Sequence, residues 1–199
     1  MQTNVFLLPD LINPDVVGGS CCVIIDVLRA TTTIVTAFAN GARSIIPCLS
    51  IEHAIEIANQ QQVLLGGERD CVKPEAFDLG NSPAAYSRDV VKDIDIAFTT
   101  TNGTKAMLAC TRADKLLLAA FSNLTAITSM TAQESNLNII CSGTNGEITL
   151  EDVLLAGAIV HSRTEQSFAD VNDQATLALN AWEEILASDI PATSLLDKM

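Results

Sequence analysis

The stretch Cys21-Cys22-Val23-Ile24-Ile25-Asp26-Val27-Leu28-Arg29-Ala30-Thr31-Thr32-Thr33 decides the fold class of this chain. Its first five residues form a continuous apolar, β-prone run, which is typical of a strand buried on both faces. From Thr31 the pattern becomes helical and lasts to Asn40, and Gly41 follows as a C-terminal cap. A buried strand that leads directly into a helix indicates an α/β unit.

The same alternation of strand and helix repeats along the chain. Strands are predicted over 4–8, 21–25, 44–48, 63–66, 94–98, 115–119 and 137–141. Helices are predicted over 31–40, 51–60, 104–110, 124–131, 150–162 and 170–186, with another starting at Ser82-Pro83 and a long loop over 67–81. Asp170 or Asn172 is expected to cap the last helix. We therefore expect one α/β domain over 1–199, with a mostly parallel sheet and helices on both faces.

Composition limits the partners and the cellular compartment. The 199 residues include 11 Lys and Arg against 24 Asp and Glu, a net charge of −13 that repels phosphate backbones and argues against nucleic-acid binding. The sequence shows neither a signal peptide nor an apolar run of about 20 residues, so we expect a cytoplasmic protein without a membrane segment. Six cysteines without metal-ligand spacing are expected to be buried, reduced thiols. A homodimer is the expected assembly for an enzyme of this size.

Four short polar segments follow predicted strands. They are 26–33, 66–69, 99–104 and 141–146, and they are rich in hydroxyls, glycines and charges. Open α/β sheets bind ligands in the crevice outside the carboxyl ends of their strands. The sequence therefore predicts a site for a small anion at this edge.

Asp26 and Arg29 are the first candidates for chemistry. A carboxylate at a strand end can hold Mg²⁺, and Arg29 can bind a pair of acidic oxygens in a fork. Thr31 and Thr32 offer hydroxyls and N–H groups at a helix N-terminus. The alternative is that Asp26 only caps the helix and pairs with Arg29. A haloacid-dehalogenase site is excluded, because the second Asp that it needs is replaced by Leu28.

Glu68 and Arg69 form the second candidate pair. Gly66-Gly67 before them allows a close backbone approach, and the adjacent opposite charges suit a metal ion and an anion respectively. A solvated surface pair explains the same residues. Asn81 lies in the following loop, where turn formation before a helix is the alternative role.

The segment Thr100-Thr101-Asn102-Gly103-Thr104 resembles an anion-binding nest at a helix start. A tight Asn-Gly turn is the alternative. The segment 141–146 is similar and weaker, and Glu151 and Asp152 after it are explained equally well as first-turn acids that complement the helix dipole. Neither glycine-rich segment has the spacing of a P-loop or of a GxGxxG motif.

Taken together, the blocks 26–33, 66–69, 77–83, 99–104 and 150–152 resemble the 2-phosphosulfolactate phosphatase (ComB) family. The resemblance runs in order from about residue 22 to residue 173. It implies an α/β fold, Mg²⁺ dependence and hydrolysis of (2R)-2-phospho-3-sulfolactate to sulfolactate and phosphate, a step of coenzyme M biosynthesis in methanogens.

On this hypothesis the metal ligands are Asp26 and Glu68, joined by Glu151 or Asp152. Arg29 and Arg69 then clamp the anionic groups of a small phosphorylated substrate. Neutral contacts are assigned to Thr31, Thr32, Asn81, Thr101, Asn102, Gly103 and Thr104. Two alternatives stay open: a phosphatase for another phosphorylated hydroxy acid, and a non-catalytic anion-binding protein.

Overall fold

The computed structural model describes residues 1–166 and 170–188. The strands are β1 (Gln2–Phe6), β2 (Cys21–Ile25), β3 (Ser44–Pro47), β4 (Leu64–Gly67), β5 (Asp95–Thr99), β6 (Lys115–Ala119), β7 (Asn136–Cys141) and β8 (Asp170–Val171). The α-helices are α1 (Ala30–Ala39), α2 (Ile51–Gln60), α3 (Arg88–Val91), α4 (Gly103–Ala109), α5 (Leu124–Thr131), α6 (Leu150–Gln166) and α7 (Asp173–Ala187). Short 3₁₀ helices lie at Pro9–Leu11, Pro14–Val16, Pro83–Ala85 and Phe121–Asn123.

Every predicted strand is present, and the differences lie mainly at the ends of elements. The helix expected at Ser82-Pro83 is only a 3₁₀ turn, because the Ser82 side chain makes no capping bond and the α-helix forms later, as α3. The two-residue strand β8 was not predicted, since two residues are too few to show a period. The last helix begins at Asp173, and Asn172 caps it by accepting the N–H of Ala175.

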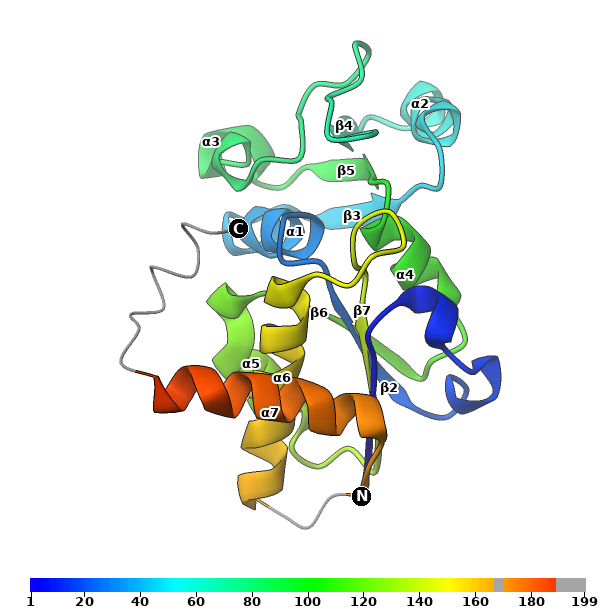
Figure 1. Cartoon of the computed structure of the whole chain (residues 1–199). Helices are drawn as coiled ribbons and strands as arrows, with labels where there is room; N and C mark the ends of the chain where they lie inside the picture. Colours follow the sequence, from blue (N-terminus) through cyan, green and yellow to red (C-terminus); the bar gives the residue numbers. More distant parts are fainter. Residues whose placement is uncertain (167–169, 189–199) are drawn as a thin grey trace.

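The strands form two parallel sheets, where the sequence had suggested one. The five-stranded sheet has the order β6-β2-β7-β1-β8, and the three-stranded sheet has the order β3-β5-β4. All of their pairings are parallel. In Figure 1, α1 and α4 lie between the three-stranded sheet at the top and the five-stranded sheet below.

Alternating side chains of β2 explain why helices cover both faces of the larger sheet. Cys21, Val23 and Ile25 pack with residues of α6 and α7 in one apolar cluster. Cys22 and Ile24 point the other way, into a second cluster with α1, α4 and the inner face of β5. A third, smaller cluster lies between the outer face of the three-stranded sheet and α2. The predicted α/β fold with helices on both faces is confirmed.

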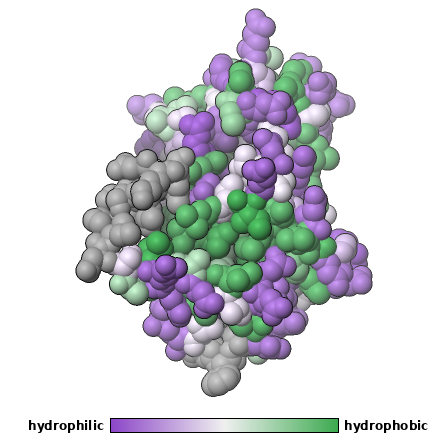
Figure 2. Space-filling model, in the orientation of Figure 1, coloured by the Kyte–Doolittle hydropathy of each residue, from purple (hydrophilic) through white to green (hydrophobic). Residues whose placement is uncertain are grey.

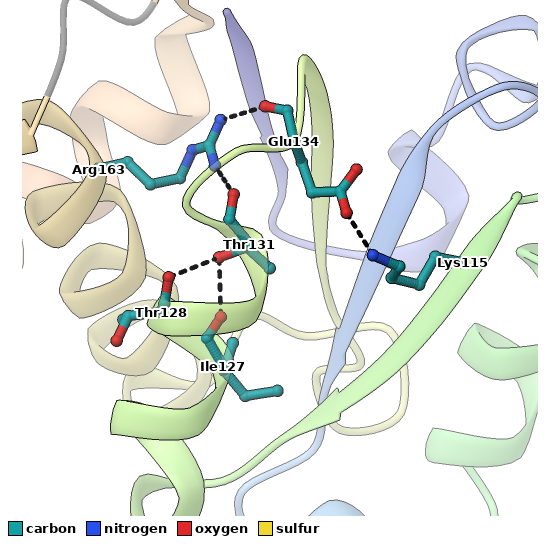
Figure 3. Close-up of polar contacts among 6 residues, drawn as sticks. All are labelled: Lys115, Ile127, Thr128, Thr131, Glu134 and Arg163. Atoms are coloured by element: carbon teal, nitrogen blue, oxygen red, sulfur yellow. Dashed lines mark hydrogen bonds and ion pairs between the residues drawn. The ribbon is translucent and has the colours of Figure 1, made fainter.

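A buried arginine fixes the far end of α6. Arg163 is 3% exposed; its Nε donates to Thr3 Oγ1 at 3.0 Å, and Nη2 donates to the Glu134 carbonyl at 2.8 Å. Nη1 donates to the carbonyl of Thr131, at the C-terminus of α5, and Glu134 also pairs with Lys115 (Figure 3). A guanidinium at a helix C-terminus satisfies carbonyls that the helix itself leaves without partners. These contacts hold α6 against β1 and α5.

All six cysteines are free thiols, as expected. Five are buried, but Cys71 is exposed, so the prediction of burial is wrong for that residue. Within residues 1–166 and 170–188, none of the helices has both the length and the apolarity that crossing a bilayer requires.

Candidate active site

The four polar segments of the sequence follow β2, β4, β5 and β7, so they come from both sheets. They surround a cavity of about 170 Å³. Its lining residues are Asp26, Leu28, Arg29, Glu68, Asp70, Cys71, Asn81, Thr101, Asn102, Thr144 and Asn145. A larger cavity of about 520 Å³, between α1, α4, β3 and β6, has a mostly apolar lining without a charged side chain. The polar cavity is therefore the candidate active site.

Asp26 is a nearly buried carboxylate in the loop between β2 and α1. Its Oδ1 accepts the N–H of Ala30 at 2.9 Å. Burial raises the pKa of Asp26 to about 6, with a further increase from the negative charges of Glu68 and Glu151, while the N–H groups of Ala30 and Gly103 oppose the rise. A buried carboxyl near other acids is a frequent feature of catalytic sites.

Glu68 joins two loops of the three-stranded sheet. Its Oε1 accepts the N–H of Thr101 at 2.7 Å, and its Oε2 accepts the N–H of Cys71 at 2.6 Å and the Thr101 hydroxyl at 3.2 Å. Gly67 makes this approach possible, since it has φ +120° and a Cβ there would lie 1.9 Å from the Thr99 carbonyl oxygen. The sequence indicated a close backbone approach at Gly66-Gly67, and in the structure β4 approaches the backbone of Thr99 in β5 at Gly67.

Gly103 starts α4 directly against the buried carboxylate. A Cβ at this position would lie 2.8 Å from Asp26 Oδ2 and 2.8 Å from Ala30 Cβ. Thr100 and Thr104 exchange hydrogen bonds across the same turn, each hydroxyl accepting the N–H of the other residue. Thr101 and Asn102 face the cavity, whereas Thr104 is buried in the turn.

The hydroxyls of Thr31 and Thr32 at the start of α1 bind the backbone of the loop after β2 and do not face the cavity. Thr31 Oγ1 donates to the Asp26 carbonyl at 2.8 Å, and Thr32 Oγ1 donates to the Val27 carbonyl at 2.6 Å. Neither residue lines the cavity. The sequence identified the segment correctly, but only the folded loop shows that these two side chains hold its shape.

The two arginines differ in their surroundings. Arg29 is exposed and lines the cavity. Arg69 lies outside the lining, and its Nη2 donates to the Leu49 carbonyl at 3.1 Å and to Thr99 Oγ1 at 2.7 Å. Arg29 is therefore the better placed of the two for binding an anion.

The remaining predicted residues divide between the cavity and its support. Asn81 lines the cavity, and its buried Oδ1 has no hydrogen-bond partner within the described residues. Asp152 is 2% exposed and accepts backbone N–H groups with both oxygens. Burial raises its pKa to about 7, to which the charges of Asp26 and Glu151 also contribute. Glu151 is half-buried, near enough to act electrostatically on both carboxyls.

Sequence reasoning assigned no role to several lining residues. Leu28 lines the cavity and is 45% exposed. On the face of the molecule that Figure 2 shows, apolar side chains gather in the middle, and hydrophilic ones are more frequent above and below them. Asp70 and Cys71 reach the cavity because both adopt a positive φ, which reverses the chain after Arg69. Thr144 and Asn145 belong to the polar segment after β7 that the sequence had marked.

Comparison with known proteins identifies the family. A family model described as 2-phosphosulpholactate phosphatase matches residues 6–196 of this chain. The chain belongs to the 2-phosphosulfolactate phosphatase family. That assignment, expected from the sequence blocks, makes it a member of a family of phosphoric monoester hydrolases.

Three bacterial relatives named "Probable 2-phosphosulfolactate phosphatase" illustrate the similarity. The Clostridium perfringens (strain 13) protein is 38% identical over 184 residues, which is 89% of this chain and 74% of the relative. The Pseudothermotoga lettingae protein is 40% identical over 187 residues (94% and 78%). The Thermotoga maritima protein is 42% identical over 178 residues (86% and 76%). The family model, which matches residues 6–196, includes every segment that lines the cavity.

Proposed function

We propose that this chain is a Mg²⁺-dependent phosphatase that hydrolyses (2R)-2-phospho-3-sulfolactate to 3-sulfolactate and phosphate. The observation that carries the proposal is the nearly buried pair Asp26 and Glu68 on the wall of a small cavity that also holds the exposed Arg29. Buried acids attract a cation, and an arginine attracts an anion, so the cavity suits a metal ion together with an anionic ester. The names of the relatives supply the substrate.

The donor set fits Mg²⁺ bound together with its substrate. Within the described ranges, no three His, Cys, Asp or Glu side chains are grouped closely enough to hold a metal by themselves. Mg²⁺ in proteins usually keeps several waters and is bound by one or two carboxylates plus phosphate oxygens. Asp26 and Glu68 would be those carboxylates, with Glu151 as a third candidate nearby. When bound, the ion neutralises negative charge on the phosphoryl oxygens.

The chain's own residues bind the ester and move the proton. Arg29 binds the phosphate, sulfonate or carboxylate of the substrate in a fork, while Thr101 and Asn102 add neutral contacts from the β5 loop. Asp26 either attacks phosphorus, in which case water protonates the leaving ester oxygen and then hydrolyses the aspartyl phosphate, or it takes a proton from the attacking water and passes that proton to the leaving ester oxygen. Both roles need a carboxylate held still, which the Ala30 N–H provides.

Two other functions remain as outcomes of the test. A phosphatase for another phosphorylated hydroxy acid needs the same acids and the same arginine, because one set of donors recognises sulfonate and carboxylate alike. A non-catalytic anion-binding protein has no need for paired carboxylates next to Arg29. Metal dependence therefore separates binding from catalysis.

The experiment measures phosphate release by the purified protein from phosphosulfolactate and from a panel of other phosphorylated hydroxy acids. Each reaction is run with Mg²⁺ and with EDTA. We expect release from phosphosulfolactate that EDTA abolishes and that added Mg²⁺ restores. Release from a different ester alone would contradict the substrate, and phosphate binding without release from any ester would contradict catalysis.

A further inference from the structure

Three loops from both sheets form the wall of the cavity around Arg29, and they are linked by one chain of hydrogen bonds. The loop after β2 carries Leu28 and Arg29, and the loop after β7 carries Thr144 and Asn145. The Asn145 N–H donates to Asn102 Oδ1 at 3.2 Å, which connects the β7 loop to the loop after β5. The Ser142 N–H donates to the Ile25 carbonyl at 2.8 Å where β2 and β7 end, and beyond that point Asp152, which lies outside the lining of the cavity, links the two loops.

Asp152 accepts one backbone N–H from each of these two loops. Its Oδ1 accepts the N–H of Val27 at 2.9 Å, and its Oδ2 accepts the N–H of Gly143 at 3.1 Å. Gly143 has φ +60°, and a Cβ there would lie 2.4 Å from the Glu147 carbonyl oxygen. The β7 loop is therefore bent so tightly that only glycine can bring this N–H to the carboxylate.

The chemistry of the position favours a carboxylate. Two N–H donors converge on Asp152, and a carboxylate presents an acceptor to each, whereas an amide would present its own donor to one of them. The residue also lies in the first turn of α6, where the helix N-terminus stabilises negative charge. Asp152 is 2% exposed, so a lost bond would leave a backbone N–H without water to replace the carboxylate.

We propose that Asp152 is a positioning residue that holds the β2 and β7 loops at the separation at which Arg29 and Thr144–Asn145 contact the same bound anion. Glu151 differs in kind, because it is half-buried and has no such backbone bonds in the described structure. This inference rests on the proposed function only in taking the bound group to be the phosphoryl group or its product. The role is distinct from metal binding, which the sequence had suggested for the same side chain.

The test uses Asp152→Asn, which keeps the size of the side chain and one acceptor. Asp173→Asn is the matched control, since Asp173 is an exposed acid in the first turn of the neighbouring helix α7. Inorganic phosphate is titrated calorimetrically without Mg²⁺, and amide exchange at Val27 and Gly143 is followed by NMR. We expect the phosphate dissociation constant to rise about 10-fold, and at least one of the two amides to exchange more than about 10-fold faster than in the control.

A second readout separates positioning from metal binding. In Asp152→Asn, kcat/KM should fall mainly through a higher KM, while the Mg²⁺ concentration for half-maximal activity should stay within about twofold of wild type. Unchanged phosphate affinity, or a Mg²⁺ requirement raised tenfold with phosphate affinity intact, would overturn the proposal. Fast hydrogen exchange at the Val27 and Gly143 amides of the wild type would also overturn the proposal, because it would show that Asp152 does not hold these two N–H groups. If the wild type showed no turnover, the proposed phosphatase function would be contradicted. The positioning role of Asp152 would still be tested, because the phosphate titration and the amide-exchange measurement need no turnover.

Discussion

At the scale of the residue, the buried carboxylate of Asp26 lowers the stability of the fold but suits the proposed reaction. The residue is 8% exposed, and burial together with nearby acids raises the pKa of its carboxyl group to about 6. A charge held in such surroundings lowers the stability of the folded protein, because water would solvate it better. The proposed function would explain why the chain keeps this acid, since only the charged form can bind a cation or attack phosphorus.

The substitution Asp26→Asn tests both sides of this conflict. The amide oxygen still accepts the Ala30 N–H, so the loop should keep its shape. We expect phosphate release to fall by at least about 100-fold, and the free energy of unfolding at pH 7 to rise by about 1–3 kcal/mol as the buried charge disappears. Thermal unfolding and initial rates measure the two effects, with exposed Asp89→Asn as control. A variant that remains active would refute the role of Asp26.

Position 103 requires a glycine because α4 begins in close contact with Asp26 and Ala30. A methyl group there would press on Asp26 Oδ2 and Ala30 Cβ, both at 2.8 Å, so α4 would have to move away from β2. We expect Gly103→Ala to lower the stability by about 1–3 kcal/mol and to reduce kcat/KM by about tenfold. Gly18→Ala is the control, because its Cβ would meet only Arg112 Nη2, at 3.9 Å. Equal activities of the two variants would show that this close approach has no catalytic importance.

At the scale of the element, α6 connects the core to the candidate site. Its first turn carries Asp152, which binds the β2 and β7 loops, and its fourth turn carries the buried Arg163, which binds β1 and the end of α5. The middle of the helix packs in the apolar cluster on the outer face of the five-stranded sheet. The position of the loops around Arg29 therefore depends on contacts at both ends of one helix.

Replacing Arg163 by Met tests whether its hydrogen bonds to β1 and to the end of α5 stabilise the fold. The change keeps an apolar side chain but leaves the carbonyls of Thr131 and Glu134 and the Thr3 hydroxyl without this donor. We expect a loss of about 3 kcal/mol in the free energy of unfolding. Urea denaturation measures it, and Arg112→Met on the surface should change the stability by less than about 0.5 kcal/mol. Equal midpoints for both variants would contradict a structural role of this network.

At the scale of the whole molecule, the two buried aspartates should make stability depend on pH. The folded pKa values of Asp26 and Asp152 are about 6 and about 7, above the usual 3.8, so the native state binds protons that the unfolded chain has already released. Their contribution is complete below about pH 4 and is lost as the pH rises through 6 to 7. We expect the metal-free protein to melt several degrees higher at pH 5 than at pH 7.5.

The same measurement on Asp26→Asn isolates one of the two groups. The difference in melting temperature between pH 5 and pH 7.5 should shrink, because one titrating group is gone. EDTA in every sample removes the effect of bound metal ions. An unchanged difference between the two pH values would mean that Asp26 titrates near its usual pKa in the folded chain.

The arrangement of the sheets shows what local sequence can and cannot convey. The runs 21–25 and 137–141 identified buried strands, because burial on both faces demands mostly apolar side chains. No local pattern states which strands pair. The division into a five-stranded and a three-stranded sheet follows from the packing of α1 and α4 between them, with residues of both sheets in one cluster.

The sequence by itself determined the α/β class, the order of all the strands except β8, the family and the polar segments that reach the candidate site. These depend on local periodicity and on short blocks of residues, which a linear chain displays directly. Only the tertiary structure decided the role of each side chain: Thr31 and Thr32 hold a loop, Arg69 bonds to Leu49 and Thr99, and Asp152 joins two loops. The physical reason is that a hydroxyl, a guanidinium or a carboxylate serves structure or ligand according to which donors and acceptors the fold brings within about 3 Å of it.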